Sequence, residues 1–358
     1  MKKINEYKFE ELNYNSIRLN ANESNSIFSK NEVIDILLDL DINGFNRYPD
    51  SNSIKLRKAY GNIIGYDYKK ILAGNGSDQM IGTMISTYIN RGDKILTLNP
   101  DFSMYDFYGS MNEGTIIKFD ISKKGKFLIE DFITLGKESK PKVIIFSNPN
   151  NPTGLEISPK DIELLIESFK DVKVVIDEAY IEFGEYSSLN LIDKYKNLYI
   201  TRTMSKAWGL AALRVGFIIS NEDNIKELEK AMVPYSINTI SQEIAVKILE
   251  YKEEMLENIE KIKSERNRMY LILKEIESES RSKIKFYKSS ANFIFGRSIY
   301  KEELKIAFID NNIMIRYFND DSFRITIGEE EENDKVINII RKVILYKEDN
   351  NEREKCQI

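Results

Sequence analysis

One lysine of this sequence has neighbours that could give it a chemical role. Lys206 lies in ITRTMSKAWGLAALRVGF, where Thr203 and Ser205 precede it and Arg214 follows eight positions later. A single lysine is ordinarily a surface charge, but hydroxyl groups flank this one. Arg214 begins an apolar strand pattern, and an arginine entering a buried strand needs a counter-charge, which a phosphate would provide. The segment therefore indicates an amine beside an anion-binding site.

Two further segments end apolar runs with polar residues. VVIDEAY places Asp177 after an apolar run and Tyr180 three positions later, and FSNPNNPTG contains Asn151. An acid at the end of a strand can cap a helix, bind a metal or take part in catalysis. A stretch of asparagine, proline and glycine can be only a turn. Taken alone, neither segment distinguishes a structural role from a functional one.

A glycine-containing turn precedes a helical pattern at AGNGSD. A strand pattern, ILAGN, leads into this turn, and QMIGTMIST follows it. The first N–H groups of a helix have no partner within the helix and can bind an anion. The candidate donors are the backbone amides of Gly76, Ser77 and Asp78.

Short β-branched runs alternate with helical patterns from about residue 70. The runs are ILAGN, KILTLN, TIIKFD, KVIIFS, VKVVID, NLYITR and LRVGFII. Such alternation predicts an α/β fold with a large, mostly parallel sheet that has helices on both faces. Ligands bind such sheets at the carboxyl ends of the strands, where the polar segments described above lie.

The pattern changes after about residue 240. A long charged helical stretch comes first, and the strand-like segments IKFYKSSANFIFG, NIMIRYF and FRITIG then predict a smaller α+β domain. The expected organisation has three parts. Residues 1–40 form an N-terminal arm and part of the small domain, 41–260 the large domain, and 261–358 the C-terminal small domain.

Composition excludes several kinds of function. The 358 residues include 52 Lys+Arg and 57 Asp+Glu, for a net charge of −5, and a pI of about 5.4 argues against a nucleic-acid-binding surface. The chain has no histidine and one cysteine, Cys356, so we expect no metal site and no histidine-dependent catalysis. No apolar run approaches the length of a membrane span. We expect a cytoplasmic protein without membrane or nucleic-acid partners.

Five motifs, in order, resemble those of fold type I aminotransferases, which depend on pyridoxal phosphate. They are AGNGSD, NPNNPTG, DEAY, SKAWGLAALRVG and FRITIG. The segments RLNANE and RYPD narrow the resemblance to the histidinol-phosphate aminotransferase group. The resemblance extends from about residue 17 to residue 330. It implies a fold type I transferase with pyridoxal phosphate as its cofactor.

The resemblance also implies roles around the cofactor ring. Lys206 would form a Schiff base with the cofactor aldehyde and later move a proton to and from the substrate α-carbon. Asp177 would keep the pyridine nitrogen protonated. Asn151 and Tyr180 would hydrogen-bond the ring oxygen, and Tyr105 would stack on the ring face.

The implied phosphate site combines backbone and side-chain donors. Its members are the amides of Gly76, Ser77 and Asp78, the hydroxyls of Thr203 and Ser205, and the Arg214 guanidinium. In the family, the tyrosine matching Tyr48 of RYPD reaches the phosphate bound to the other subunit. The resemblance thus implies a homodimer with composite active sites.

Substrate binding is expected from three residues. Strand alternation in FRITIG places Arg324 on the face opposite its apolar neighbours, and the family's matching arginine binds the anionic group of the substrate. Arg316 would add a second positive charge for a phosphate ester, unless it is a surface residue. Asn22 of NANE would line the substrate pocket.

The expected reaction converts histidinol phosphate and 2-oxoglutarate to imidazole acetol phosphate and glutamate, a step of histidine biosynthesis. The segment NESNSIF lacks the usual proline and glycine, and Gln79 replaces a usual acid. These departures leave open an aromatic or broad-specificity aminotransferase. A threonine-phosphate decarboxylase is a further alternative. A regulator that binds pyridoxal phosphate, with an added DNA-binding domain, is the alternative from another class.

Overall fold

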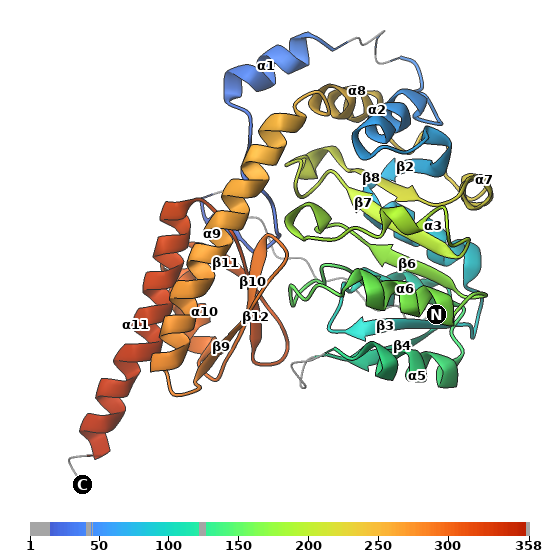
Figure 1. Ribbon diagram of the computed structural model, residues 1–358. Helices are drawn as coiled ribbons and strands as arrows, with labels where there is room; N and C mark the ends of the chain where they lie inside the picture. Colours follow the sequence, from blue (N-terminus) through green and yellow to red (C-terminus); the bar gives the residue numbers. More distant parts are fainter. Residues whose placement is uncertain (1–14, 41–43, 45, 122–126, 356–358) are drawn as a thin grey trace. The chain divides into compact units, whose positions relative to one another are not determined.

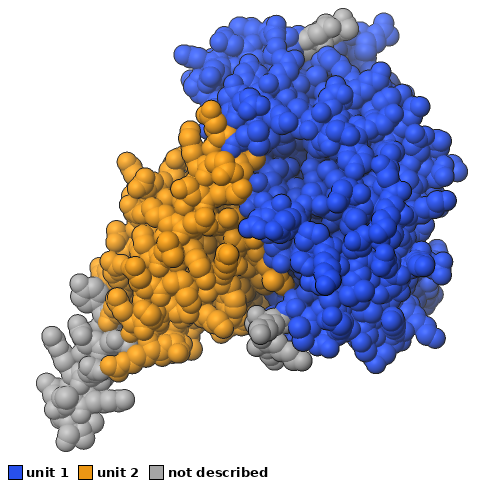
Figure 2. Space-filling model, viewed as in Figure 1, with its two compact units in different colours: residues 1–9, 26–151, 156–256 blue, residues 10–25, 152–155, 257–358 orange. Residues whose placement is uncertain are grey.

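The computed structural model describes residues 15–40, 44, 46–121 and 127–355 (Figure 1). The chain divides into two compact units (Figure 2). Among the described residues, unit 1 comprises 26–151 and 156–256, and unit 2 comprises 15–25, 152–155 and the chain from Glu257 onward. Residues 26–40, which the sequence analysis grouped with the arm and small domain, belong to unit 1 because helix α1 (Lys30–Leu38) packs on α8 (Thr239–Ile248).

Unit 1 is built on a seven-stranded sheet in the order β2-β8-β7-β6-β5-β3-β4. Strand β8 is antiparallel to both of its neighbours, and the pairings among β7, β6, β5, β3 and β4 are parallel. Each strand coincides with one of the predicted runs, which confirms the α/β, mostly parallel fold. The strands are β2 (Ile71–Asn75), β3 (Lys94–Asn99), β4 (Thr115–Asp120), β5 (Val143–Ser147), β6 (Lys173–Asp177), β7 (Leu198–Thr203) and β8 (Val215–Ile219).

Helices cover both faces of this sheet. Tyr60 of α2 stacks on Phe217 of β8, with ring centroids 3.8 Å apart. The next residue, Ile218, lies in a buried cluster with Met80 and Met84 of α3, because adjacent side chains of a strand point to opposite faces. The helices are α2 (Ile54–Ile64), η1 (Tyr68–Lys70), α3 (Gly76–Tyr88), α4 (Met104–Met111), α5 (Ile129–Ser139), α6 (Pro159–Ser168), η2 (Ile181–Phe183), η3 (Leu189–Leu191), η4 (Ala211–Leu213) and α7 (Glu222–Glu229).

The charged helical stretch after residue 240 forms two helices. Helix α8 ends at Ile248, and α9 (Lys252–Glu279) begins after a short break. The apolar residues at helical spacing are buried as the periodicity predicts: Ile248, Met255, Ile259, Ile262 and Met269. The boundary between the units, at Leu256, falls inside α9 and four residues before the expected position.

Unit 2 contains a five-stranded sheet in the order β1-β11-β12-β10-β9. Strand β1 (Ile17–Leu19) pairs in parallel with β11, and the other pairings are antiparallel. The sequence analysis did not predict β1, which has only three residues. The other elements are β9 (Ile284–Tyr287), β10 (Phe293–Ser298), α10 (Lys301–Asp310), β11 (Ile313–Tyr317), β12 (Ser322–Thr326) and α11 (Glu330–Lys355).

Across the part of the chain that the structure describes, no helix combines the length and the apolar composition that crossing a membrane requires.

Candidate active site

Several of the predicted residues of unit 1 lie at or next to strand ends along one edge of the seven-stranded sheet. Asp177 ends β6, and Thr203 ends the neighbouring β7. Because β8 is antiparallel, it starts at this edge, where Thr203 pairs with Gly216 and Asn75 of β2 pairs with Val215. The loop that carries Lys206 connects β7 to β8 at the same edge.

Asp177 is a buried carboxylate with a partner on each oxygen. Tyr105 donates to Oδ2 at 2.8 Å, and Thr201 of β7 donates to Oδ1 at 2.9 Å. Burial raises the pKa of Asp177 to about 6, although these hydrogen bonds act in the opposite direction. A carboxylate held in this way would be stabilised by a cationic ring nitrogen.

Tyr105 does not have the surroundings expected of a ring-stacking residue. Its side chain is 0% exposed and its hydroxyl group is bonded to Asp177, so it offers no free face to a ligand. The half-buried Phe102 packs edge-on against Tyr105 at 5.7 Å and retains accessible surface. These contacts do not favour the stacking role expected of Tyr105, which stays a prediction, and Phe102 is the more accessible aromatic residue.

Lys206 lies close to a second predicted site residue. Its Nζ atom is 5.9 Å from the ring centroid of Tyr180, which follows Asp177 in the loop after β6. Tyr180 is 5% exposed. The amine, the phenol and the Asp177 carboxylate thus lie in adjoining loops of one sheet edge.

The three asparagines after β5 have different partners. The Asn148 carboxamide donates to the backbone oxygen of Ile157 and accepts from its backbone N–H. These two bonds join the two ends of the loop. The Asn150 carboxamide is fully buried and donates to Pro100 O and Ser147 Oγ. Asn151 is half-buried, and its backbone N–H donates to Ser147 Oγ at 2.8 Å. A contact between the Asn151 side chain and a ligand stays a prediction.

Arg214 gathers the residues expected to bind phosphate. Its guanidinium donates to Ser205 Oγ at 3.1 Å and to Asp78 Oδ2 at 2.6 Å. Thr203 Oγ1 donates to Ser205 Oγ at 3.0 Å. Hydroxyl groups, a guanidinium and the first amides of α3 are thus in contact or adjacent, and this set of donors suits a phosphate.

Two glycines allow this close approach. Gly76, at the start of α3, has a φ of +74°, and a Cβ there would lie 2.6 Å from Arg214 Nη2. A Cβ on Gly216 of β8 would lie 2.1 Å from the backbone nitrogen of Ser77. The start of α3 therefore packs directly on β8. Gln79, which departs from the family pattern, contributes a hydrogen bond here, because its Oε1 accepts from Asn75 N at 2.6 Å.

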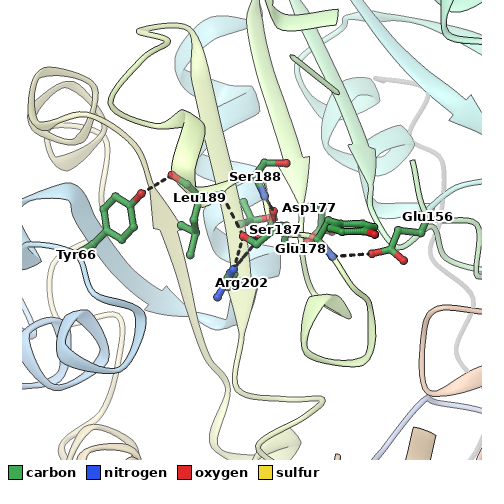
Figure 3. A network of polar contacts seen from close by, with 10 residues as sticks. Tyr66, Glu156, Asp177, Glu178, Ser187, Ser188, Leu189 and Arg202 are labelled. Carbon is green, nitrogen blue, oxygen red and sulfur yellow. Dashed lines mark hydrogen bonds and ion pairs between the residues drawn. The ribbon is translucent and has the colours of Figure 1, made fainter. Parts of the chain in front are cut away.

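A buried ion pair lies behind the Asp177 strand end (Figure 3). Nε and Nη2 of Arg202 donate to Glu178 Oε2 at 3.1 and 2.8 Å. The other Glu178 oxygen accepts from Ser188 N at 2.6 Å, and Ser187 Oγ donates to Oε2. Glu178 comes directly after Asp177 at the end of β6, and Arg202 follows Thr201 within β7, so the pair holds together the two strand ends that carry the candidate site.

Tyr48 is exposed and paired with another aromatic residue. Its side chain is 81% exposed and stacks on Tyr235, with ring centroids 4.5 Å apart and an angle of 19° between the planes. Both residues belong to unit 1. An exposed aromatic pair of this kind is compatible with a surface that a second subunit covers.

The predicted substrate residues belong to unit 2. Arg324 of β12 and Arg316 of β11 are direct cross-strand partners. Arg324 is 7% exposed, donates to Asn20 O at 2.7 Å and lies 5.2 Å from the ring centroid of Phe293. Asn22 is 1% exposed, and its backbone N–H donates to Thr326 Oγ1 at 3.0 Å. The bonds of Asn22 thus fix its segment within unit 2, and a contact with substrate stays a prediction.

The residues of unit 1 fit pyridoxal phosphate in each of its functional groups. Lys206 offers an amine for the aldehyde, Asp177 a buried carboxylate for the ring nitrogen, and Arg214 with its neighbours a phosphate site. The glycine at position 76 keeps the phosphate side free of a Cβ. Thr201, which bonds to Asp177, and Phe102, which packs on Tyr105, were not predicted as site residues, since both contacts are tertiary.

Comparison with known proteins agrees with this chemistry. Residues 4–340 match the family described as aminotransferase class I and II. A histidinol-phosphate aminotransferase of Clostridium novyi is 42% identical over 332 residues, which cover 91% of each chain. Another, of Clostridium kluyveri, is 35% identical over 351 residues and covers 96% of this chain and 97% of its own.

A solved structure shares the fold. The histidinol-phosphate aminotransferase of Sinorhizobium meliloti, crystallised in complex with pyridoxal 5′-phosphate, superposes with a TM-score of 0.80 at 20% sequence identity. The alignment covers 92% of this chain and 90% of that one. The chain therefore belongs to the class I and II aminotransferase family and is a fold type I enzyme that depends on pyridoxal phosphate.

Proposed function

We propose that the protein transfers the amino group of histidinol phosphate to 2-oxoglutarate, with imidazole acetol phosphate and glutamate as products. The observation that carries this proposal is the similarity to histidinol-phosphate aminotransferases, at 42% and 35% identity over nearly the whole chain. The proposed reaction is a step of histidine biosynthesis.

Pyridoxal phosphate supplies an electron sink for the bond that breaks at the substrate α-carbon. The chain supplies the proton transfers. Lys206 Nζ would take the proton from the substrate α-carbon and hold it for the return transfer. Asp177 keeps the proton on the ring nitrogen, because a buried carboxylate stabilises the adjacent cation.

The contacts with the ring and phosphate are assigned to unit 1. Asn151 and Tyr180 donate to the ring oxygen, and Phe102 packs on the ring face. The phosphate takes the amides of α3 and the side chains of Thr203, Ser205 and Arg214. Direct contact between these groups supports this assignment for Ser205 and Arg214.

Arg316 and Arg324 bind the anionic groups of the substrates. Like charges directly opposite one another on neighbouring strands repel, so an anion bound at this pair is favoured by both. We assign the phosphate of histidinol phosphate and the carboxylate of glutamate to these arginines in the two half-reactions. Asn22 positions the segment that carries Asn20, whose carbonyl accepts from Arg324.

We further propose a homodimer in which Tyr48 completes the phosphate site of the partner subunit. The support is the 81% exposure of Tyr48 and its stacking on a second exposed tyrosine, since large aromatic residues on a free surface are typical of interfaces.

The experiment is a visible-absorbance scan of the pyridoxal-phosphate-loaded protein with histidinol phosphate, phenylalanine or threonine phosphate. Conversion to the amine form of the cofactor by histidinol phosphate supports the proposal. Conversion by phenylalanine alone would identify an aromatic aminotransferase. Carbon dioxide release from threonine phosphate would identify a decarboxylase, and either of these two results would overturn the substrate assignment.

A further inference from the structure

A half-buried carboxylate outside the predicted site connects two segments that carry predicted site residues. Asp101 lies in the turn between β3 and α4, and Oδ1 of its side chain accepts from Phe102 N at 2.7 Å. The same oxygen accepts from Ser147 Oγ at 2.5 Å, and Oδ2 accepts from Ser147 N at 3.2 Å. Asp101 thus joins the turn before α4 to the end of β5.

Ser147 bonds to both Asp101 and Asn151, and so links the two residues. A hydroxyl group has one donor and two acceptor positions. Ser147 Oγ donates to Asp101, accepts from Asn151 N at 2.8 Å, and accepts a longer bond of 3.4 Å from Asn150 Nδ2. Ser147 is 1% exposed and Asn150 is 0% exposed. All three hydrogen-bonding positions of the Ser147 hydroxyl are therefore occupied, and water has little access to it. The Asp101 carboxylate thus determines the orientation of this hydroxyl.

A carboxylate is specifically suited to position 101. All of its partners are donors, namely two backbone N–H groups and one hydroxyl. An asparagine there would turn its NH₂ group toward one of these donors and leave one hydrogen bond unmade. Burial raises the pKa of the Asp101 carboxyl well above its ordinary value, and the nearby Asp177 adds to this. The chain therefore keeps a carboxyl group at position 101 although its ionised form is disfavoured there.

We infer that Asp101 is a positioning residue of the active site, which fixes the main chain of Asn151 through Ser147 and the Phe102 turn through its own backbone contact. Phe102 and Tyr105 lie one helical turn apart, and Tyr105 is bonded to Asp177. One carboxylate thus sets the position of the ring-oxygen donor, the stacking residue and the partner of Asp177. This inference rests on the contact proposed between Asn151 and the ring oxygen.

The test compares Asp101→Asn, Ser147→Ala and Asn151→Ala with a control, Asp106→Asn. Asp106 lies in α4 and pairs with Lys118 at 2.5 Å, outside the Asp101 network. The readout is the pH midpoint of the visible absorbance change of the pyridoxal-phosphate-loaded protein. A weakened donor leaves more negative charge on the ring oxygen, which favours protonation of the neighbouring nitrogen.

We expect Asn151→Ala and Asp101→Asn to raise this midpoint by about one pH unit, as expected for a weakened charge-assisted hydrogen bond. Asp106→Asn should leave it unchanged. The turnover number of Asp101→Asn should fall about 10- to 100-fold, the usual effect of a displaced site residue. The double variant D101N/S147A should shift the midpoint no further than the larger single change, because both act along one path.

The outcomes separate this inference from the contact on which it rests. A midpoint that moves in Asn151→Ala but not in Asp101→Asn or Ser147→Ala would overturn the inference alone. An unchanged midpoint in Asn151→Ala would overturn the proposed Asn151 contact, and the inference with it. Should Asp101→Asn fail to fold, Ser147→Ala removes only the hydroxyl and decides the question.

Discussion

The hydroxyl of Tyr105 donates to Oδ2 of Asp177 at 2.8 Å, and this places a fully buried phenol against the carboxylate proposed to face the cofactor ring. Thr201 donates to the other oxygen. The carboxylate is therefore fixed in position by neutral donors, and these compensate only part of the cost of burying a charge. The remaining cost has measurable consequences for the protein without its cofactor.

The stability of the cofactor-free protein should depend on pH through Asp177. Its pKa is raised to about 6 from an ordinary 3.8, so the folded state binds this proton more tightly than the unfolded state. The stabilising contribution is complete below about pH 4 and is lost as pH rises to about 6, a change on the order of 3 kcal/mol. Urea unfolding of wild type and Asp177→Asn from pH 4 to 7 measures it as the difference between the two proteins.

The difference removes the effect of groups common to both proteins. Glu182, whose pKa burial raises to about 7, titrates in the same range in both. A difference in unfolding free energy that stays constant from pH 4 to 7 would contradict the raised pKa of Asp177.

Lys206→Ala should abolish amino transfer while the protein still folds. The substitution removes the amine that moves the proton, and Lys206 lies in a loop and not in the core cluster. Turnover is measured with the preferred amino donor, and folding by circular dichroism. Lys230→Ala, at an exposed position after α7, is the matched control and should keep full activity. Appreciable turnover in Lys206→Ala would remove the central assignment.

Breaking the Glu178–Arg202 pair should destabilise unit 1 strongly. Both side chains are nearly inaccessible, at 0% and 9%, so Arg202→Met leaves a buried charge without its partner. We expect a loss of about 3 to 5 kcal/mol in the free energy of unfolding. The exposed pair Lys194–Glu163 is the control, and Lys194→Met should cost less than about 1 kcal/mol. Restoring part of the loss in R202M/E178Q would identify the unpaired charge as its cause.

Arg324→Ala should weaken the binding of substrate far more than the binding of cofactor. The loss of charge-assisted hydrogen bonds worth about 1.5 to 3 kcal/mol corresponds to a 10- to 150-fold weaker complex. Substrate affinity is measured by the absorbance titration, and cofactor affinity by reconstitution of the cofactor-free protein. Arg341→Ala, at an exposed position of α11, should change neither. Equal losses in the two affinities would contradict the role of Arg324.

Two inactive variants should restore activity to one another if Tyr48 serves the partner subunit. A mixed dimer of Tyr48→Ala and Lys206→Ala has one site with both defects and one with neither. Equal mixing after unfolding and refolding should then recover about one quarter of the wild-type activity. Activity that merely equals the average of the two separate variants would show that Tyr48 does not act across an interface.

The sequence predicted the strands of unit 1 because buried parallel strands are continuous apolar runs that end in polar residues. The residues proposed to bind phosphate could be named from the sequence because they lie in recognisable motifs. The sequence did not predict that Tyr105 would be buried against Asp177, because that depends on how α4 packs on the sheet. Strand β1 was missed for a similar reason: three residues carry no period, and the pairing with β11 is entirely tertiary.

The Asp101–Ser147 contact was beyond sequence reasoning too. The two residues are 46 positions apart, and each looks like an ordinary turn or strand-end residue. Only the parallel alignment of β3 and β5 brings their ends together. The same is true of Glu178, just after β6, and Arg202 in the neighbouring β7. Nothing in the sequence indicates the register of β6 and β7 that brings this acid and this base together.

The pairing of β1 with β11 also determines when the sheet of unit 2 can form during synthesis. Asn22 bonds to Thr326, 304 positions later. At a synthesis rate of 5 to 20 residues per second, the ribosome needs about 15 to 60 s to make the intervening chain. Every strand of the seven-stranded sheet emerges in that interval. The segment that carries Asn22 thus leaves the ribosome before all seven strands of that sheet and gains its native neighbours only after them.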